Sequence, residues 1–219
     1  MEMIGKSQIS YEDVMEGGLL LHACCGPCAT WPLEDLAEHG VTPELYYYNP
    51  NIHPEVEWQR RLEALETLAE SKGLELHLAK VWDEHIWRNI GQRELERCRF
   101  CYTVRLRKVA EKAKELGMAY FTTTLLVSPY QKHDLLHQAG ALAEKATGVR
   151  YIAADWTERF RYGQDLARQM GLYRQKYCGC CISLDESKFN EKILREHEAF
   201  VAKESTAKVE DLVELILPR

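Results

Sequence analysis

The sequence predicts an α/β fold: a doubly wound, mostly parallel sheet, Rossmann-like or HUP-like, with helices on both faces and a C-terminal helical segment. A chain of 219 residues is long enough to bury a core without disulfide staples. Its composition, 46% hydrophobic with no low-complexity tract, is that of a globular protein. Short β-like runs alternate with helical stretches. Residues 1–17 are expected to be an N-terminal extension. Residues 18–219 are expected to form a single domain, because no linker or change in composition divides that stretch.

Five short β-like runs are the expected strands of the sheet. Because helical stretches separate them, the strands are expected to run parallel, as they do when helices connect successive strands. The expected strands are residues 19–23, 44–49, 74–79, 119–125 and 149–153.

Apolar residues recur at helical spacing between these runs. Gly73, Gly117 and Gly40 follow three such stretches where helix ends are expected, and Pro32 is expected in the first turn of the third. The chain after the last strand is expected to close with two helices, 188–202 and 209–217. The three apolar faces consist of Trp58, Leu62, Leu65 and Ala69, of Val109, Ala113 and Leu116, and of Leu33, Leu36 and Ala37.

Composition and hydropathy exclude several classes of protein. The longest apolar runs fall far short of the roughly 20 residues of a membrane helix, so no membrane partner is expected. The N-terminus lacks the basic start and apolar run of a secretory signal, which makes the cytoplasm the expected location. The net charge of -6 argues against a uniformly basic nucleic-acid surface.

One stretch departs from this acidity. Residues 88–114 contain nine basic side chains against three acidic ones. Either this stretch steers a phosphate-rich substrate toward the cysteines that it surrounds, or it is a solvated helix face with a chance bias.

Eight cysteines fall in three clusters with none left over. In a cytosolic chain thiols stay reduced, so this clustering indicates metal ligation or redox chemistry rather than disulfide staples. The first cluster follows the first expected strand, at the sheet edge where α/β folds bind ligands, and stands where a glycine-rich phosphate loop is otherwise found. The clusters are Cys24, Cys25 and Cys28, then Cys98 and Cys101, then Cys178, Cys180 and Cys181.

The second cluster is expected at the start of a helix. The spacing of Cys98 and Cys101 places both sulfurs on one side of the first turn, where the helix N-terminus is expected to lower their pKa. Together with Cys24 and Cys25 they make four soft ligands, which suit zinc or an iron–sulfur cluster. A structural zinc site is the alternative, although 69 residues between its halves is long for a zinc ribbon. Its ligands would be Cys25, Cys28, Cys98 and Cys101.

The third cluster contains a Cys-Gly-Cys sequence. Cys178 and Cys180 are close enough along the chain to form a small, strained disulfide of the labile, catalytic kind, and Gly179 supplies the backbone freedom that such a ring needs. Further metal ligands or buried spare thiols are the alternative. Cys181 is expected to be a structural thiol.

Three softer candidates also have two interpretations. Tyr46–Tyr48 are either core residues or a base-stacking platform. His53 either donates to a substrate or fixes its own loop. Lys132 and His133, in the run 128–134, either contact phosphate or begin the next helix, with Asp134 as a capping neighbour.

Several motifs together resemble one family. The chain is similar to the cobalamin-independent epoxyqueuosine reductases, which complete queuosine synthesis in tRNA. Adjacent cysteines, a distant C-x-x-C pair and a Tyr-Cys-Gly-Cys ending form a rare combination, and the matches run in order from about residue 18 to 185. The motifs are LLLHACCGPCAT, YYYNPNIHPEVEWQRR, RCRFCYTVRL, TTTLLVSPYQKHD and GLYRQKYCGC.

The resemblance implies a redox centre. It implies a redox-active disulfide between Cys178 and Cys180 and an additional iron with Cys28 as its expected ligand; Cys181 departs from the family pattern. No cobalamin is expected. A 4Fe-4S cluster is implied on Cys24, Cys25, Cys98 and Cys101.

The resemblance also implies a reaction and a substrate. The reaction is a two-electron reduction of the epoxide of epoxyqueuosine, at the anticodon wobble position of tRNA, with water leaving. An unidentified electron donor is required, and the basic stretch 88–114 is expected to hold anticodon-stem phosphates.

Two other functions fit parts of the sequence. An ATP-dependent tRNA-modifying or nucleotide-reducing enzyme would need a pyrophosphate loop of the Ser-Gly-Gly type, where this chain has CCGPC. A zinc-binding, RNA-interacting module without redox activity would explain the cysteines and the basic stretch. It would be colourless, whereas a cluster protein prepared without oxygen is brown.

Overall fold

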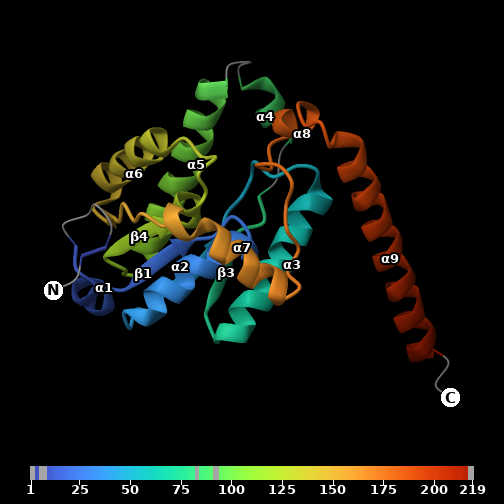
Figure 1. Cartoon of the computed structure of the whole chain (residues 1–219), viewed down its shortest axis with the longest axis horizontal. Coiled ribbons are helices and arrows are strands. Elements are labelled where there is room, and N and C mark those ends of the chain that lie inside the picture. The colour runs from blue at the N-terminus through green and yellow to red at the C-terminus, as the bar shows by residue number, and fades with distance from the viewer. Residues whose placement is uncertain (1–2, 5–8, 82–83, 91–93, 217–219) are drawn as a thin grey trace.

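The computed structural model describes residues 3–4, 9–81, 84–90 and 94–216, with side chains described as far as residue 204. Five parallel strands form one sheet in the order β3-β2-β1-β4-β5 (Figure 1). The order reverses between β1 and β4, which confirms the predicted doubly wound, parallel sheet. The strands are β1 (Leu19–His22), β2 (Glu44–Tyr47), β3 (Leu76–Leu78), β4 (Tyr120–Thr123) and β5 (Arg150–Tyr151).

Helices cover both faces of the sheet. α5 and α6 pack together on one face, and α2 packs with α3 and α7 on the other (Figure 1). The short 3-10 turns η1 (Thr124–Val127) and η2 (Thr157–Arg159) follow β4 and β5. The helices are α1 (Tyr11–Gly17), α2 (Gly26–Glu38), α3 (Glu55–Lys72), α4 (Glu84–Asn89), α5 (Glu94–Glu115), α6 (His133–Thr147), α7 (Phe160–Gln169), α8 (Cys181–Asp185) and α9 (Asn190–Ile216).

Two helix predictions were wrong. The C-terminal segment is one continuous helix, α9, rather than two, and it runs along the outside of the molecule (Figure 1); the predicted end at residue 217 lies outside the described residues. α2 begins at Gly26 with Pro27 in its first turn, so Pro32 lies inside the helix. The predicted ends at Gly73 and Gly117 are confirmed, because α3 and α5 stop just before them.

The N-terminal segment packs on the sheet domain where it is described. α1 begins with a capping box at Ser10, and the ring of Tyr11 stacks on His39 at 3.8 Å between ring centroids. Parts of the predicted extension, residues 1–2 and 5–8, lie outside the described residues. Its separation from the domain at residue 18 stays a prediction.

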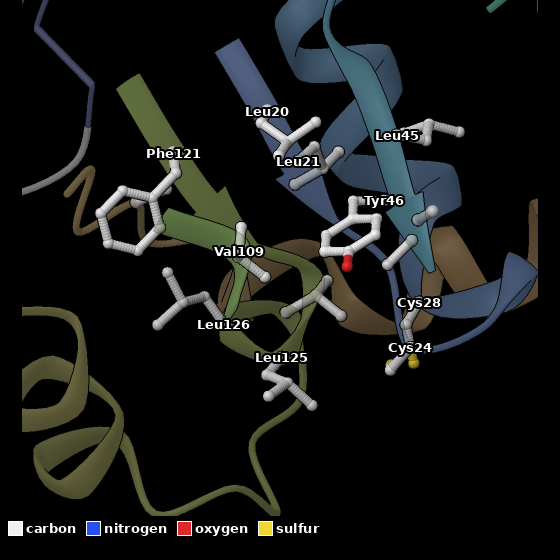
Figure 2. Close-up of a cluster of buried hydrophobic side chains, with 14 of the residues drawn as sticks. Leu20, Leu21, Cys24, Cys28, Leu45, Tyr46, Val109, Phe121, Leu125 and Leu126 are labelled. Carbon is white, nitrogen blue, oxygen red and sulfur yellow. The ribbon is translucent and has the colours of Figure 1, made fainter. Parts of the chain in front are cut away.

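The core ends where the cysteines begin. β1 is fully buried, and Leu20 and Leu21 belong to an apolar cluster that also contains Phe121 (Figure 2). Cys24 and Cys28 border this cluster beyond the carboxyl end of β1 (Figure 2). Parallel strands therefore deliver these thiols to the sheet edge where α/β folds bind ligands. Within the described residues, no helix has the length and apolar character needed to cross a membrane.

Candidate active site

Three buried thiols gather where β1 passes into α2. The sulfur atoms of Cys24, Cys25 and Cys28 all lie within 4.8 Å of one another, and the first two are 3.7 Å apart. No further His, Cys, Asp or Glu of the described residues completes such a group. Gly26 allows α2 to start against α3, because a Cβ there would lie 2.4 Å from the Ala64 carbonyl oxygen.

The three thiols share charge unequally. Hydrogen bonds from Cys25 and Cys28 hold the pKa of Cys24 well below its usual value. Burial raises the pKa of Cys25. The hydrogen bond between Cys28 and Cys24 raises the pKa of Cys28. The hydroxyl of Thr124 also donates to the Cys24 sulfur at 3.5 Å. The group therefore favours one thiolate before any metal binds.

These donors fit a soft metal. Two sulfurs bound at 2.3 Å to one tetrahedral ion are separated by about 3.8 Å, close to the observed 3.7 Å between Cys24 and Cys25. Thiolates are also the ligands of iron–sulfur clusters. The trio was not singled out as a ligand set from the sequence, although its position at one strand–helix junction was a usable signal.

Cys98 and Cys101 lie on α5 and line a cavity of about 190 Å³. The prediction that the helix N-terminus lowers their pKa was wrong. α5 begins at Glu94, so Cys98 lies beyond the first three residues of the helix, and burial raises its pKa to about 11. Burial likewise raises the pKa of Cys101, against the opposing charge of Arg105, whose guanidinium lies 3.7 Å from the Cys101 sulfur.

The first two cysteine clusters face one region of the molecule. A second cavity, of about 320 Å³, is lined by Cys24 and Cys28, and Leu125, Tyr130 and Cys178 line both cavities. Among the described residues, Cys98 and Cys101 do not come within the 4.8 Å grouping of the trio. The four-ligand set drawn from both clusters therefore stays a prediction.

The third cluster forms a free dithiol beside both cavities. The sulfurs of Cys178 and Cys180 lie 3.6 Å apart; Cys178 is exposed and Cys180 half-buried. The hydrogen bond between these two sulfurs lowers the pKa of Cys178 to about 6 and raises the pKa of Cys180. Cys181, the first residue of α8, is 1% exposed, as expected of a structural thiol.

The backbone of the dithiol turn is held by a buried arginine. Arg61 of α3 donates from Nη1 to the Cys178 carbonyl at 3.1 Å and from Nη2 to the Tyr177 carbonyl at 3.0 Å. Its Nε donates to Glu57 at 2.7 Å. Sequence reasoning missed both charged residues; the only signal was their i, i+4 spacing beside the apolar face of a helix.

The softer candidates have structural explanations. Tyr46–Tyr48 are buried, which favours the core interpretation over a stacking platform. His53 is buried, and its backbone N–H donates into the dithiol turn at 2.8 Å, so it fixes a loop. His133 begins α6, and the Lys132 ammonium lies 3.1 Å from a Glu94 carboxylate.

The basic stretch is largely paired within the chain. Arg88 and Arg97 form ion pairs with Asp185 and Glu186, which tie α8 to α4 and α5, and Arg105 is buried. Three further cations pair with glutamates on α5 itself, while Arg93 lies outside the described residues. Part of the stretch therefore ties together the elements around Cys98 and Cys101, and another part pairs along the surface of α5.

Comparison with known proteins identifies the family. The family model described as "Epoxyqueuosine reductase QueH" matches residues 19–186, a span that includes all eight cysteines. The chain belongs to the QueH family. This confirms the resemblance found in the sequence motifs.

Similar proteins with this name occur in several bacteria. The QueH protein of Dehalococcoides mccartyi is 40% identical over 172 residues, 75% of this chain and 91% of that protein. The QueH protein of Thermotoga maritima is 31% identical, over 78% of this chain and 92% of that protein. The QueH protein of Streptococcus pyogenes is also 31% identical, over 74% of this chain and 68% of that protein. A solved structure titled as a predicted subunit of tRNA methyltransferase from Methanocaldococcus jannaschii matches at TM-score 0.47 and 14% identity, over 69% of this chain and 76% of that one.

Proposed function

We propose that this protein is an epoxyqueuosine reductase, an oxidoreductase that converts epoxyqueuosine at the wobble position of tRNA into queuosine. One observation carries the proposal: an exposed dithiol and a buried thiol trio flank one pair of cavities in a chain that matches the family model over residues 19–186. The name that its relatives carry, epoxyqueuosine reductase, supports a tRNA substrate, because epoxyqueuosine is a modification of tRNA.

The dithiol balances the reaction. Removing the epoxide oxygen as water, and leaving an alkene, takes two electrons and two protons. Oxidation of Cys178 and Cys180 to a disulfide releases two electrons and two protons, so one dithiol is oxidised per epoxide reduced. An external donor then reduces the disulfide. Cys178 is the sulfur that such a donor reaches, because it is exposed while Cys180 is half-buried.

The remaining cysteines supply metal ligands in this proposal. Cys24, Cys25, Cys98 and Cys101 would hold a 4Fe-4S cluster, and Cys28 would be the ligand left for an additional iron. The support is geometric: Cys98 and Cys101 line one cavity, Cys24 and Cys28 line the other, and the two cavities share Leu125, Tyr130 and Cys178 in their walls. Once bound, such a centre transfers single electrons and offers a Lewis-acidic iron to an epoxide oxygen.

The larger cavity is the proposed place for the modified base. Tyr130 forms part of its wall, is 79% exposed, and packs edge-on against Phe160 at 5.9 Å between ring centroids. Single-stranded anticodon nucleotides are commonly held by stacking on exposed aromatic rings. Tyr130 is therefore the expected stacking partner of a nucleotide whose epoxide faces Cys28 and Cys178.

A second candidate function follows from the tight trio. The 3.7 Å separation of Cys24 and Cys25 suits a single zinc ion and favours a zinc-binding, RNA-interacting module without redox activity. That module gives no role to an exposed dithiol with one thiol pKa near 6.

The two functions separate in one assay. Protein purified without oxygen is incubated with epoxyqueuosine tRNA and a chemical reductant, and the nucleosides are analysed by mass spectrometry. The wild type is expected to form queuosine, Cys178→Ser to lose turnover, and the matched control Cys181→Ser to keep it. Full turnover by Cys178→Ser would contradict the role of the dithiol, and no queuosine from the wild type would contradict the function.

A further inference from the structure

The residue that positions the dithiol lies on a different element from the dithiol itself. Arg61 is 1% exposed and uses all three guanidinium nitrogens: one on Glu57 and two on consecutive carbonyls of the dithiol turn. Backbone carbonyls only partly compensate a charge that has been removed from water. Burying an arginine against them therefore costs free energy unless a carboxylate also pairs with the guanidinium. Glu57 provides that carboxylate.

Glu57 accepts hydrogen bonds from three side chains. It is 0% exposed and accepts hydrogen bonds from Arg61 at 2.7 Å, from the Tyr173 hydroxyl at 2.6 Å and from His197 at 2.8 Å. Burial alone would raise the pKa of Glu57, but the Arg61 charge and these hydrogen bonds lower it to about 2. The carboxylate is therefore charged at neutral pH, and the pair anchors α9 through His197.

The network holds both ends of one short segment. Tyr173 binds Glu57, while the carbonyls of residues 177 and 178 bind Arg61. Between these points, the Gln175 amide donates to the Cys28 sulfur at 3.2 Å. The Glu57–Arg61 pair thus sets where the dithiol stands relative to the buried thiol trio.

The turn is also shaped to fit the guanidinium. Gly179 has a φ of +116°, and a Cβ there would lie 3.1 Å from Nη1 of Arg61. The planar fork of arginine binds two carbonyls and a carboxylate at once, whereas a lysine ammonium is a single point charge. Stability alone does not call for this arrangement, because apolar residues of similar volume often serve as well as a buried ion pair.

We propose that Arg61 is a positioning residue for the Cys178–Cys180 dithiol. Paired with Glu57, it fixes the carbonyls of residues 177 and 178. It thereby sets the reactivity of the two thiols and their position relative to the thiol trio. This inference rests on the proposed function only for its effect on turnover. Its effect on the dithiol itself is measurable without any tRNA.

The test compares Arg61→Lys with a control on the same helix. Lys72 of α3 pairs with Glu34 at 2.6 Å, and Lys72→Gln removes an ion pair that is remote from the turn. Two readouts use the anaerobically purified holoprotein without substrate. The first is the alkylation rate of Cys178 by iodoacetamide at pH 7, with buried Cys181 as internal reference. The second is the midpoint of the dithiol–disulfide couple in glutathione buffers.

Arg61→Lys is expected to change the alkylation rate at least fivefold and to move the glutathione ratio at the midpoint by a similar factor. It should also lower kcat about tenfold or more with KM within twofold, because small misplacements of reacting groups are costly. Lys72→Gln should change none of these values.

A double variant, Glu57→Gln with Arg61→Met, keeps the inference falsifiable if Arg61→Lys folds poorly. It removes both buried charges together and leaves the two carbonyls without their fork. Altered dithiol readouts in either folded variant support the positioning role, even if the protein reduces no epoxyqueuosine. Wild-type alkylation and midpoint in a folded variant would overturn the role, even if the protein proves to be a reductase.

Discussion

Replacing Gly179 with alanine tests how tightly the dithiol turn is built. The turn holds Gly179 at a φ of +116°, which L side chains rarely adopt, and an added Cβ would lie 3.0 Å from Ile52 Cγ1 and 3.1 Å from Arg61 Nη1. Gly171 offers a matched control in the same segment of chain. Its φ is +68°, and a Cβ there would meet nothing within 4 Å.

Gly179→Ala is expected to cost more stability than Gly171→Ala. Gly171→Ala meets only the backbone penalty of a left-handed conformation, about 1 to 2 kcal/mol. Gly179→Ala meets a backbone penalty of about 1 to 3 kcal/mol in a sparsely populated region. Crowding against Ile52 and Arg61 adds about 1 to 3 kcal/mol, as overpacking does elsewhere. The total for Gly179→Ala is therefore about 2 to 6 kcal/mol.

The free energy of unfolding is measured by urea denaturation of anaerobically purified protein, followed by circular dichroism, for the wild type and both variants. Gly179→Ala is expected to be less stable than Gly171→Ala by more than about 1 kcal/mol and to alter the alkylation rate of Cys178, whereas Gly171→Ala leaves that rate unchanged. Equal losses of stability together with equal alkylation rates would refute the close packing of the turn on Arg61.

Three further predictions concern the metal, the substrate and pH. Cys24→Ser and Cys98→Ser are each expected to lose bound iron and sulfide while keeping the far-ultraviolet circular dichroism of the wild type; iron retained in both would contradict the ligand assignment. Tyr130→Ala should raise KM for tRNA about tenfold with little change in kcat, because stacking on one base is worth about 1 to 3 kcal/mol. The control is Tyr162→Ala, which removes a 47% exposed tyrosine packed on Trp31. An equal KM for both variants would argue against stacking. The alkylation rate of Cys178 in reduced protein should be constant above pH 7 and fall about tenfold per pH unit below the Cys178 pKa of about 6, since protonation removes the thiolate. A midpoint of this rate profile above pH 8 would show an ordinary thiol.

Local pattern was sufficient to predict the sheet. All five strands lie within the predicted runs, because a buried strand of a parallel sheet needs a short apolar run and little else; the edge strands β3 and β5 are shorter than predicted and less buried than the central three. The C-terminal helices were predicted as two, but they are one. The sequence between residues 203 and 208 includes Ser and Thr, each only modestly unfavourable in a helix, and the helical stretches on either side propagate through it.

The site could be predicted in residue type but not in geometry. The motifs placed Cys24 and Cys25 at the carboxyl edge of the sheet, which is where β1 delivers them. The pKa of Cys98 was predicted in the wrong direction, because α5 begins four residues earlier and burial outweighs any effect of the helix end. The role of Arg61 depends on carbonyls 116 and 117 residues away, which no local pattern contains.

The central claim is that these thiols form an iron–sulfur redox centre acting on epoxyqueuosine tRNA. The most direct measurement is the iron, sulfide and zinc content of protein purified without oxygen, followed by nucleoside mass analysis after incubation of the same sample with epoxyqueuosine tRNA and reductant. About four iron and four sulfide per chain are expected, with any additional iron on top, little zinc, and formation of queuosine. Zinc without sulfide, and no queuosine, would contradict the claim.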